Sequence, residues 1–159
     1  MPCTHDDAWL TVALETDSRV MAELGGPQTE TYARDAHRRR VEGMKTGNWF
    51  FKLVPEPGAT PVGTIVMWPS EWAGEPISEA GWMVLPDHQG KGFASAGLGL
   101  LIERAREDGR WGDIHAFPGA TNGPSNALCR KFGFEQIETV DVDYGGRNLR
   151  CNHWVLRVG

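Results

Sequence analysis

Two glycines beside a lysine, within the stretch DHQGKGFAS at residues 87–95, form the clearest chemical motif of this sequence. Gly90 and Gly92 follow a stretch that Pro86 ends, and they stand directly before a strongly helical stretch. Backbone N–H groups converge in such a loop, and the helix N-terminus adds about half a positive charge. Glycine also lets the backbone approach a ligand closely and adopt a positive φ. The motif therefore predicts a site for an anionic ligand.

Four interpretations of this loop are a nucleotide triphosphate site, a dinucleotide site, a site for the pyrophosphate of coenzyme A, and a ligand-free turn. A P-loop needs a hydroxyl residue directly after its lysine, but Gly92 follows Lys91. A dinucleotide loop needs a third glycine where Ser95 stands, and an acidic residue that ends the next strand, whereas Asp113 begins it. The first two interpretations are therefore disfavoured, and the last two stay open.

Composition indicates a single domain over residues 1–159, because a chain of 17.6 kDa is large enough for one hydrophobic core. The chain is 40% apolar and 23% charged, as in soluble globular proteins. It has no apolar run of the ~20 residues that a membrane span needs. The start, MPCTHDDAWL, lacks the features of a signal peptide. We therefore expect a cytoplasmic protein that does not bind membranes.

The cysteines, the histidines and the net charge exclude further classes. Three widely spaced cysteines without a CxxC pair indicate reduced thiols, with neither a disulfide framework nor a zinc site. The five histidines show no HxH or HExxH spacing, so we expect no metal site. A net charge of −5 argues against general nucleic-acid binding. The basic cluster at residues 34–40 is interpreted as a solvated helix face.

The elements that must position the glycine loop follow from periodicity and from turn residues. Helices are expected over residues 6–24, capped by Asp6 or Asp7 and with a break near Asp17, and over 29–45, 93–108 and 122–132. Strands are expected over residues 48–54, 61–69, 77–85 and 113–117, followed by two long strands around Gly145 and Gly146. The Pro/Gly-rich stretches 55–61 and 69–76 are predicted to be loops.

This order of elements, αα–ββ–βαβα–ββ, predicts an α/β (α+β) domain. Its central sheet is expected to be mixed, mostly antiparallel and flanked by helices. A strand, a glycine loop and a helix over residues 77–108 form the single crossover. The strands at 77–85 and 113–117 are therefore expected to be parallel neighbours.

Two stretches resemble the GNAT superfamily of N-acetyltransferases. Residues 89–94, QGKGFA, match its Q/R-x-x-G-x-G/A signature within the strand–loop–helix stretch GWMVLPDHQGKGFASAGLGLLIERA. NGPSNALCRKFGF resembles the short helix and the K-x-G-F turn that follow the fifth strand of the family. LETDSRVMAELGG looks like the first helical region of the ribosomal-protein N-terminal acetyltransferase branch. Only MPCT precedes the first helix, so the first strand of the family is expected to be very short or missing.

The resemblance implies acetyl-CoA as co-substrate, no metal, and the GNAT fold with its parallel crossover at the cofactor site. Family members bind the pyrophosphate through the loop, which here corresponds to Gln89, Gly90, Lys91, Gly92, Phe93, Ala94 and Ser95. They pair the pantetheine arm with the strand backbone at the positions of Met83, Val84 and Leu85, and face its other side with Asn122 and Ser125. Lys91 and His88 add positive potential in an acidic chain.

The activity that the resemblance implies is acetyl transfer from the thioester to a primary amine, by direct attack in a ternary complex. Glu79 corresponds to a frequent glutamate of the family and is the candidate base, with Glu71 and Glu75 as weaker candidates. The alternative for Glu79 is a surface carboxylate. A backbone N–H near Val84 is the candidate oxyanion donor.

The general acid is not assigned by the sequence. Many relatives have a tyrosine where Cys129 stands, and a free thiol has a pKa near 8.5. Cys129 and Ser125 are the candidate acids, and water is the alternative. We favour Cys129 as a small buried residue that only packs.

The acceptor is expected to be a small-molecule or peptide N-terminal amine. Trp68, Trp72 and Glu79 are candidate substrate-binding residues, since tryptophans and carboxylates attract a cation. A protein N-terminus, a polyamine-like metabolite and an aminoglycoside all fit this description, and a homodimer stays open. The competing hypothesis is a non-catalytic module with a GNAT fold that binds acyl-CoA.

Overall fold

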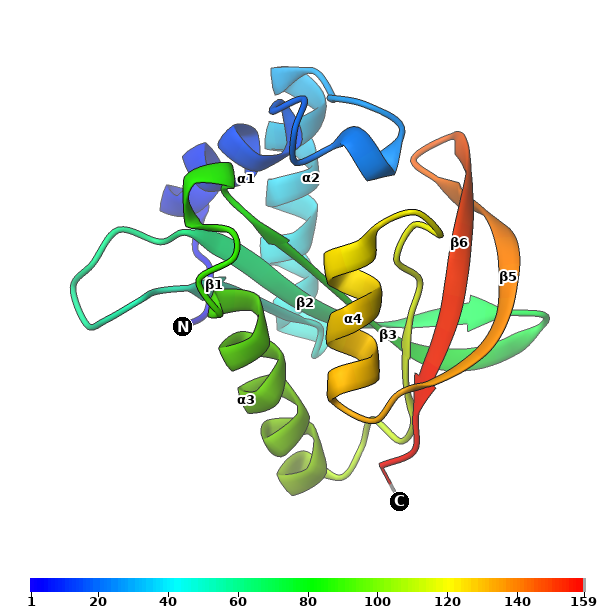
Figure 1. Cartoon of the computed structure of the whole chain (residues 1–159). Coiled ribbons are helices and arrows are strands. Elements are labelled where there is room, and N and C mark those ends of the chain that lie inside the picture. Colours follow the sequence, from blue (N-terminus) through cyan, green and yellow to red (C-terminus); the bar gives the residue numbers. More distant parts are fainter. Residues whose placement is uncertain (159) are drawn as a thin grey trace.

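The computed structural model of the protein describes residues 1–158, which form one mixed sheet with helices on both faces (Figure 1). Over these residues the helices are α1 (Ala8–Glu15), α2 (Glu30–Gly43), α3 (Phe93–Asp108) and α4 (Gly123–Lys131). The strands are β1 (Trp49–Leu53), β2 (Gly63–Trp72), β3 (Glu75–Val84), β4 (Ile114–Ala116), β5 (Glu135–Tyr144) and β6 (Arg147–Leu156). Their order in the sheet is β1-β2-β3-β4-β6-β5. All neighbours are antiparallel except β3 and β4, so the predicted fold class and the parallel pair are confirmed.

The helices α3 and α4 cover one face of the sheet and enclose the main core. An apolar stripe of α3 is buried there against Ile65 and Met67 of β2. The stripe comprises Leu98, Leu101, Ile102 and Ala105. The helices α1 and α2 pack on the opposite face, where Phe50 and His37 meet edge to face with ring centroids 5.2 Å apart. Because α1 and α2 cover this side of β1, Phe50 is completely buried.

The first helix is shorter than the predicted stretch 6–24, and its cap differs. α1 ends at Glu15, because the Asp17 carboxylate accepts hydrogen bonds from the N–H groups of Arg19 (2.7 Å) and Val20 (3.2 Å) and so forms a turn. The predicted cap by Asp6 or Asp7 is corrected, since Thr4 accepts from the backbone of Asp6 and Asp7 accepts from the backbone of Thr4. Thr29 caps α2, since its Oγ1 accepts from the Tyr32 N–H at 3.1 Å.

Residues 69–76 are not the loop that the sequence predicted. β2 and β3 stay paired to the end and turn through two residues, Ala73 (φ 52°) and Gly74 (φ 80°). Two consecutive positive φ values make a turn whose twist matches that of the flanking strands. Glu71, Trp72 and Glu75 therefore lie on paired strands near a hairpin tip.

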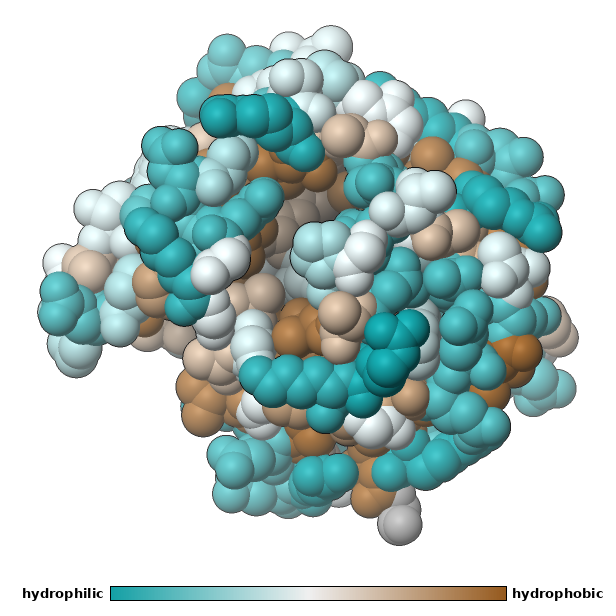
Figure 2. Space-filling view, viewed as in Figure 1, coloured by the Kyte–Doolittle hydropathy of each residue, from teal (hydrophilic) through white to brown (hydrophobic). Residues whose placement is uncertain are grey.

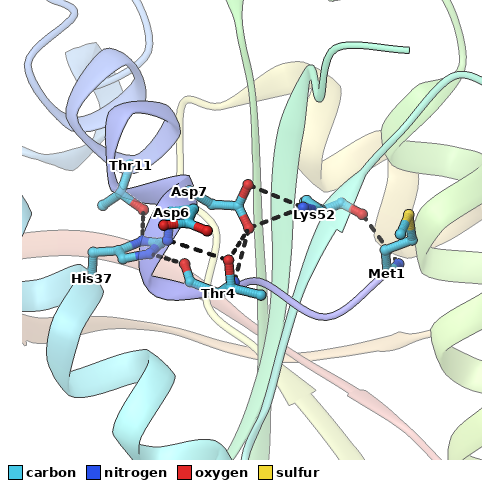
Figure 3. Close-up of polar contacts among 7 residues, drawn as sticks. All are labelled: Met1, Thr4, Asp6, Asp7, Thr11, His37 and Lys52. Atoms are coloured by element: carbon cyan, nitrogen blue, oxygen red, sulfur yellow. Dashed lines mark hydrogen bonds and ion pairs between the residues drawn. The ribbon is translucent and has the colours of Figure 1, made fainter. Parts of the chain in front are cut away.

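The N-terminus lies along β1 in place of a full first strand. The Cys3 N–H donates to the Phe50 carbonyl (2.9 Å), and the Lys52 N–H donates to the Met1 carbonyl (2.8 Å). Figure 3 shows how side chains hold this segment: Lys52 Nζ lies 3.0 Å from both carboxylate oxygens of Asp7. The very short first strand that the sequence predicted is thus a single bridge.

A buried histidine joins this N-terminal segment to α2. His37 Nε2 lies 2.7 Å from the Thr4 carbonyl oxygen, and Nδ1 lies 2.7 Å from Thr11 Oγ1 (Figure 3). A carbonyl only accepts, so Nε2 carries the proton and Nδ1 accepts from the Thr11 hydroxyl. Burial lowers the pKa of His37, which keeps this ring neutral.

Candidate active site

The glycine loop connects β3 to α3 and leaves the start of that helix open. Gly90 (φ 74°) and Gly92 (φ 85°) both have positive φ, and a Cβ on either would meet no atom within 4 Å. Gly92 is the N-cap of α3, and no side chain caps the first-turn N–H groups. Gln89 fixes the loop, since its Nε2 donates to the Val84 carbonyl at 2.9 Å. These free N–H groups at a helix N-terminus suit an anionic ligand.

β3 and β4 separate shortly after they pair. Only Ser78–Ile114 and Glu79–His115 are register partners, and β3 then continues to Val84 while β4 ends at Ala116. The second half of β3 therefore lacks a neighbouring strand on the side of α4. Figure 2 shows this face of the molecule hollowed between the loop before α3 and the start of α4, over β3. The backbone of β3 is thus accessible to an extended ligand.

The hydrogen-bond register shows which backbone groups face this opening. The Leu85 N–H donates to the Val62 carbonyl at 2.8 Å, so the groups of Leu85 face β2. Along an antiparallel strand, the backbone N–H and C=O groups of successive residues point alternately to one side and the other. Those of Met83 therefore also face β2, whereas those of Trp82 and Val84 face the opening. Trp82 was not among the residues predicted from sequence, and the alternation along the strand is the signal that finds it.

α4 forms the other side of the opening. Ser125 Oγ accepts from Trp82 Nε1 at 3.2 Å, so this hydroxyl lies across from β3. Asn122 instead caps α4, with Oδ1 accepting from the Ser125 N–H at 3.2 Å. Lys131 Nζ lies 2.6 Å from Ser95 Oγ and brings a positive charge to the first turn of α3, where the sequence had indicated only Lys91 and His88.

Cys129 lies one turn beyond Ser125 and points into the core. Its side chain is completely buried, and burial raises the pKa of the thiol to about 12. A thiol with this pKa keeps its proton near pH 7. This placement agrees with a packing role.

Glu79 lies where β3 and β4 separate, on the face of the sheet opposite α3 and α4. Its register partners are Trp68 on β2 and His115 on β4. Burial raises the pKa of the Glu79 carboxyl to about 7, and the nearby Ser70 hydroxyl partly offsets the rise. A carboxyl with this pKa can take up and release a proton near neutral pH. Glu71 and Glu75 lie at the exposed end of the hairpin.

Residues of β5 and β6 complete the surroundings of Glu79. Burial, followed by the charge of Glu15 and with a smaller part from Glu79, raises the pKa of Tyr144 to about 12. The pKa of Cys151 is also raised, by burial and then by Glu79. Sequence reasoning assigned no role to Tyr144, Cys151 or His115, because only the pairing of distant strands brings them to Glu79.

An arginine connects the two loops at this end of the sheet. Arg147, at the start of β6, donates to the carbonyls of Gly26 and Pro27 and to the side chain of Gln28, between α1 and α2. The tip of the β5–β6 hairpin therefore lies beside the α1–α2 connection (Figure 1). Sequence reasoning did not predict this contact, which joins segments far apart in the chain.

Trp68 and Trp72 have different environments. Trp68 is half-buried beside Glu79, whereas Trp72 packs on Phe117 (ring centroids 5.1 Å apart) and donates from Nε1 to Glu138 Oε2 at 3.1 Å.

Among the described residues no group of three or more His, Cys, Asp or Glu side chains could hold a metal ion. Within residues 1–158, no helix is both long and apolar enough to cross a membrane.

Comparisons with known proteins identify the family. A family model described as "Acetyltransferase (GNAT) domain" matches residues 1–135, and no curated protein matches the chain. The fold resembles that of a GNAT-family acetyltransferase from Bacillus anthracis, with a TM-score of 0.81, 20% identity, and coverage of 99% of this chain and 93% of that one. A ribosomal-protein-alanine N-acetyltransferase from Brucella melitensis has a TM-score of 0.79 at 25% identity, covering 99% and 98%.

A third solved structure is similar over the whole chain. It is a phosphinothricin acetyltransferase from Sinorhizobium meliloti in complex with acetyl-CoA, with a TM-score of 0.79, 20% identity, and coverage of 100% of this chain and 87% of that one. The family model and the shared fold agree with the glycine loop and the separated strands. The chain belongs to the GNAT acetyltransferase family.

Proposed function

We propose that this protein, as a single domain, transfers an acetyl group from acetyl-CoA to a primary amine by direct attack in a ternary complex. The observation that carries the proposal is Glu79, a carboxyl with a pKa of about 7 at the point where β3 and β4 separate. A free amine acceptor is an ammonium ion near pH 7, and it must lose a proton before it can attack. Glu79 is suited to accept that proton.

The residues around the opening fit acetyl-CoA. The open space around Gly90 and Gly92 and the first turn of α3 would take the pyrophosphate, with Lys131 nearby. The pantetheine amides would pair with the backbone of Trp82 and with the N–H of Val84, since Gln89 already donates to the Val84 carbonyl, and we therefore shift the expected pairing from Met83 and Leu85. Bound acetyl-CoA would supply the thioester carbonyl that the amine attacks and the thiolate that leaves.

Positioning is expected to contribute more than any one side chain. Alignment of two reactants can supply ~7–11 kcal/mol, whereas one acid or base gives about 10²- to 10⁴-fold in rate. The Val84 N–H faces the opening and is our candidate donor to the carbonyl oxygen. Ser125, on the α4 side of the opening, is the candidate acid that the geometry favours over the buried Cys129.

The acceptor is proposed to be a cationic amine that reaches Glu79 beside Trp68. Arg147 holds the tip of the β5–β6 hairpin against the α1–α2 connection, and we expect this end of the sheet to bound the acceptor site. A peptide N-terminus and an alkylamine are the acceptors to test. The Brucella relative is named for a ribosomal-protein alanine, so peptides with a free N-terminal alanine come first among the substrates to test.

The test is release of free thiol from acetyl-CoA over a panel of peptides, polyamines and aminoglycosides, with a thermal-shift measurement in parallel. Amine-dependent thiol release supports the proposal. A coenzyme A-dependent thermal shift without turnover on any amine would instead establish the acyl-CoA-binding module, which the burial of Cys129 at the usual acid position keeps open.

A further inference from the structure

A chain of hydrogen bonds leads away from the strand beside Glu79. His115 Nδ1 lies 2.8 Å from His153 Nε2, and His153 Nδ1 lies 2.9 Å from Glu138 Oε2. The same Glu138 oxygen accepts from Trp72 Nε1 at 3.1 Å. The chain joins β4, β6, β5 and the β2–β3 hairpin, so it links four strands around the candidate base.

Aromatic packing holds the central ring of this chain. His153 is 4% exposed and stacks on Phe117, with ring centroids 4.4 Å apart and planes at 14°. It also stacks on His115 at 5.1 Å, and Trp72 meets its edge at 5.8 Å. Neither histidine can therefore rotate without loss of these contacts and of a hydrogen bond.

The carboxylate at one end determines where each proton lies. The hydrogen bond from His153, followed by that from Trp72, lowers the pKa of Glu138, so this group is ionised and only accepts. When both rings are neutral, His153 donates from Nδ1 to this carboxylate, and its Nε2 accepts the Nδ1 proton of His115. His115 is then left with an unprotonated Nε2, for which no hydrogen-bond partner exists among the described residues. Burial lowers the pKa of His115, which favours the neutral ring.

This unprotonated nitrogen belongs to the residue paired with Glu79. Glu79 and His115 are register partners on adjacent parallel strands, so their side chains leave the same face of the sheet. The other charged groups that act on His115 are Asp113, which raises its pKa, and Arg157, which lowers it.

Amide formation from an ammonium ion removes two protons from nitrogen and returns one to the departing thiolate. Glu79 can take one of them, and the second needs another acceptor. We propose that His115 is this second proton acceptor, with Nε2 as the accepting atom, and that His153 and Glu138 are positioning residues. The inference rests on the proposed function, because it concerns the same reaction.

The step is balanced as follows. An N–H bond of the acylated nitrogen breaks, its electron pair stays on nitrogen, and the proton binds Nε2 of His115. The resulting imidazolium keeps its hydrogen bond to His153, and the Glu138 carboxylate stabilises the positive charge through His153. The proton then leaves Nε2 to solvent, which is the one proton that the overall reaction releases. Glu79 gives up its proton through solvent, which balances the proton that the departing thiolate takes up, so both residues return to their starting forms.

The first test reads the protons without any turnover. In ¹⁵N-labelled protein, long-range ¹H–¹⁵N spectra near pH 7.5 distinguish the two neutral histidine tautomers. We expect His115 and His153 both as the Nδ1–H tautomer, and we expect Glu138→Gln to disturb this pattern. An Nε2–H tautomer at His115 in the wild-type protein would overturn the proposal, because its accepting atom would already carry a proton.

The second test compares Glu138→Gln with Asp141→Asn, which changes an exposed carboxylate on the same strand that pairs with Arg150. Without the negative charge of Glu138, the His115 imidazolium is less stable, so kcat/KM should fall about 10-fold in Glu138→Gln. A less stable imidazolium also means a lower pKa of His115, so the acidic limb that His115 contributes should move to lower pH. A purely structural role of Glu138 would reduce the folded fraction without moving this limb.

The outcomes separate this inference from the proposed function. If the wild type turns over and Glu138→Gln equals Asp141→Asn in rate and pH profile, the role of the hydrogen-bond chain is refuted and the proposed function stands. Absence of wild-type turnover on every amine would refute the proposed function itself. Equal coenzyme A affinity of both variants by calorimetry would show that the cofactor site is unaffected.

Discussion

Glu79→Gln should separate two effects of burying one carboxyl, a loss of stability and a gain in rate. Burial raises the pKa of Glu79 from 4.5 to about 7, so the folded state binds the proton more tightly than the unfolded state. The stability from this proton is fully present below pH 4.5 and is lost as the pH rises through about 7. The shift corresponds to roughly 3 kcal/mol. Glutamine does not ionise, so the variant should exceed the wild type in free energy of unfolding by up to ~3 kcal/mol at pH 8, and by little near pH 4.

The same substitution should slow the reaction. The carboxylate must be ionised to accept a proton, so the wild-type kcat/KM should fall below a pH of about 7. Glu79→Gln should lose that limb together with about 10²- to 10⁴-fold of turnover, and it should keep its coenzyme A affinity. Denaturant unfolding at pH 4.5 and pH 8 and a pH–rate series measure both effects.

Glu75→Gln is the matched control, because Glu75 lies exposed at the tip of the same hairpin. This variant should change neither the stability nor the rate. The reasoning is refuted if Glu79→Gln keeps the pH dependence of wild-type stability together with the wild-type rate, which would make Glu79 a surface carboxylate.

Three further predictions concern the cofactor loop, the core and the hairpin contact. Gly92→Val should weaken coenzyme A binding at least 10-fold by calorimetry, and Gly58→Val, which has a similar φ of 82° and equally open space, should not; equal affinities would exclude the loop as the anion site. Cys129→Ala should lower the free energy of unfolding by about 1 kcal/mol or more through a cavity and leave turnover per folded molecule unchanged. Cys129→Tyr should lower stability further through overpacking. A faster single turnover in the tyrosine variant would instead support an acid role. Arg147→Met should raise amide hydrogen exchange over residues 22–28 and the KM for the amine without changing coenzyme A affinity, and unchanged exchange would show that the contact does not hold this segment.

Local signals explain why the cofactor side was predictable. Gly90 and Gly92 mark a backbone with positive φ whatever surrounds it, and the stripe on α3 repeats every turn of a helix. The parallel pairing of β3 and β4 follows from the crossover between them. The Ala73–Gly74 turn escaped prediction, because an alanine at φ 52° carries no clear turn signal and the Pro/Gly content of the region favoured a loop.

The acceptor side depends on contacts between distant segments. His115, His153 and Glu138 come together only because β6 pairs with both β4 and β5, and a bulge between Gln136 and Glu138 sets the final register. Arg147 meets carbonyl groups some 120 residues earlier, and any residue type offers such acceptors. Neither contact is marked in the sequence by a residue spacing or by a bias in composition, so neither could be predicted from it.

Transfer of a labelled acetyl group to the acceptor nitrogen tests the central claim most directly. Wild-type protein, isotopically labelled acetyl-CoA and the best amine of the panel would be incubated together, and all species followed by mass spectrometry. We expect the label in an amide of the acceptor, at a rate that Glu79→Gln lowers about 10²-fold or more, and none on the protein. Label held on the protein, or an unlabelled acceptor despite coenzyme A binding, would contradict direct acetyl transfer to an amine.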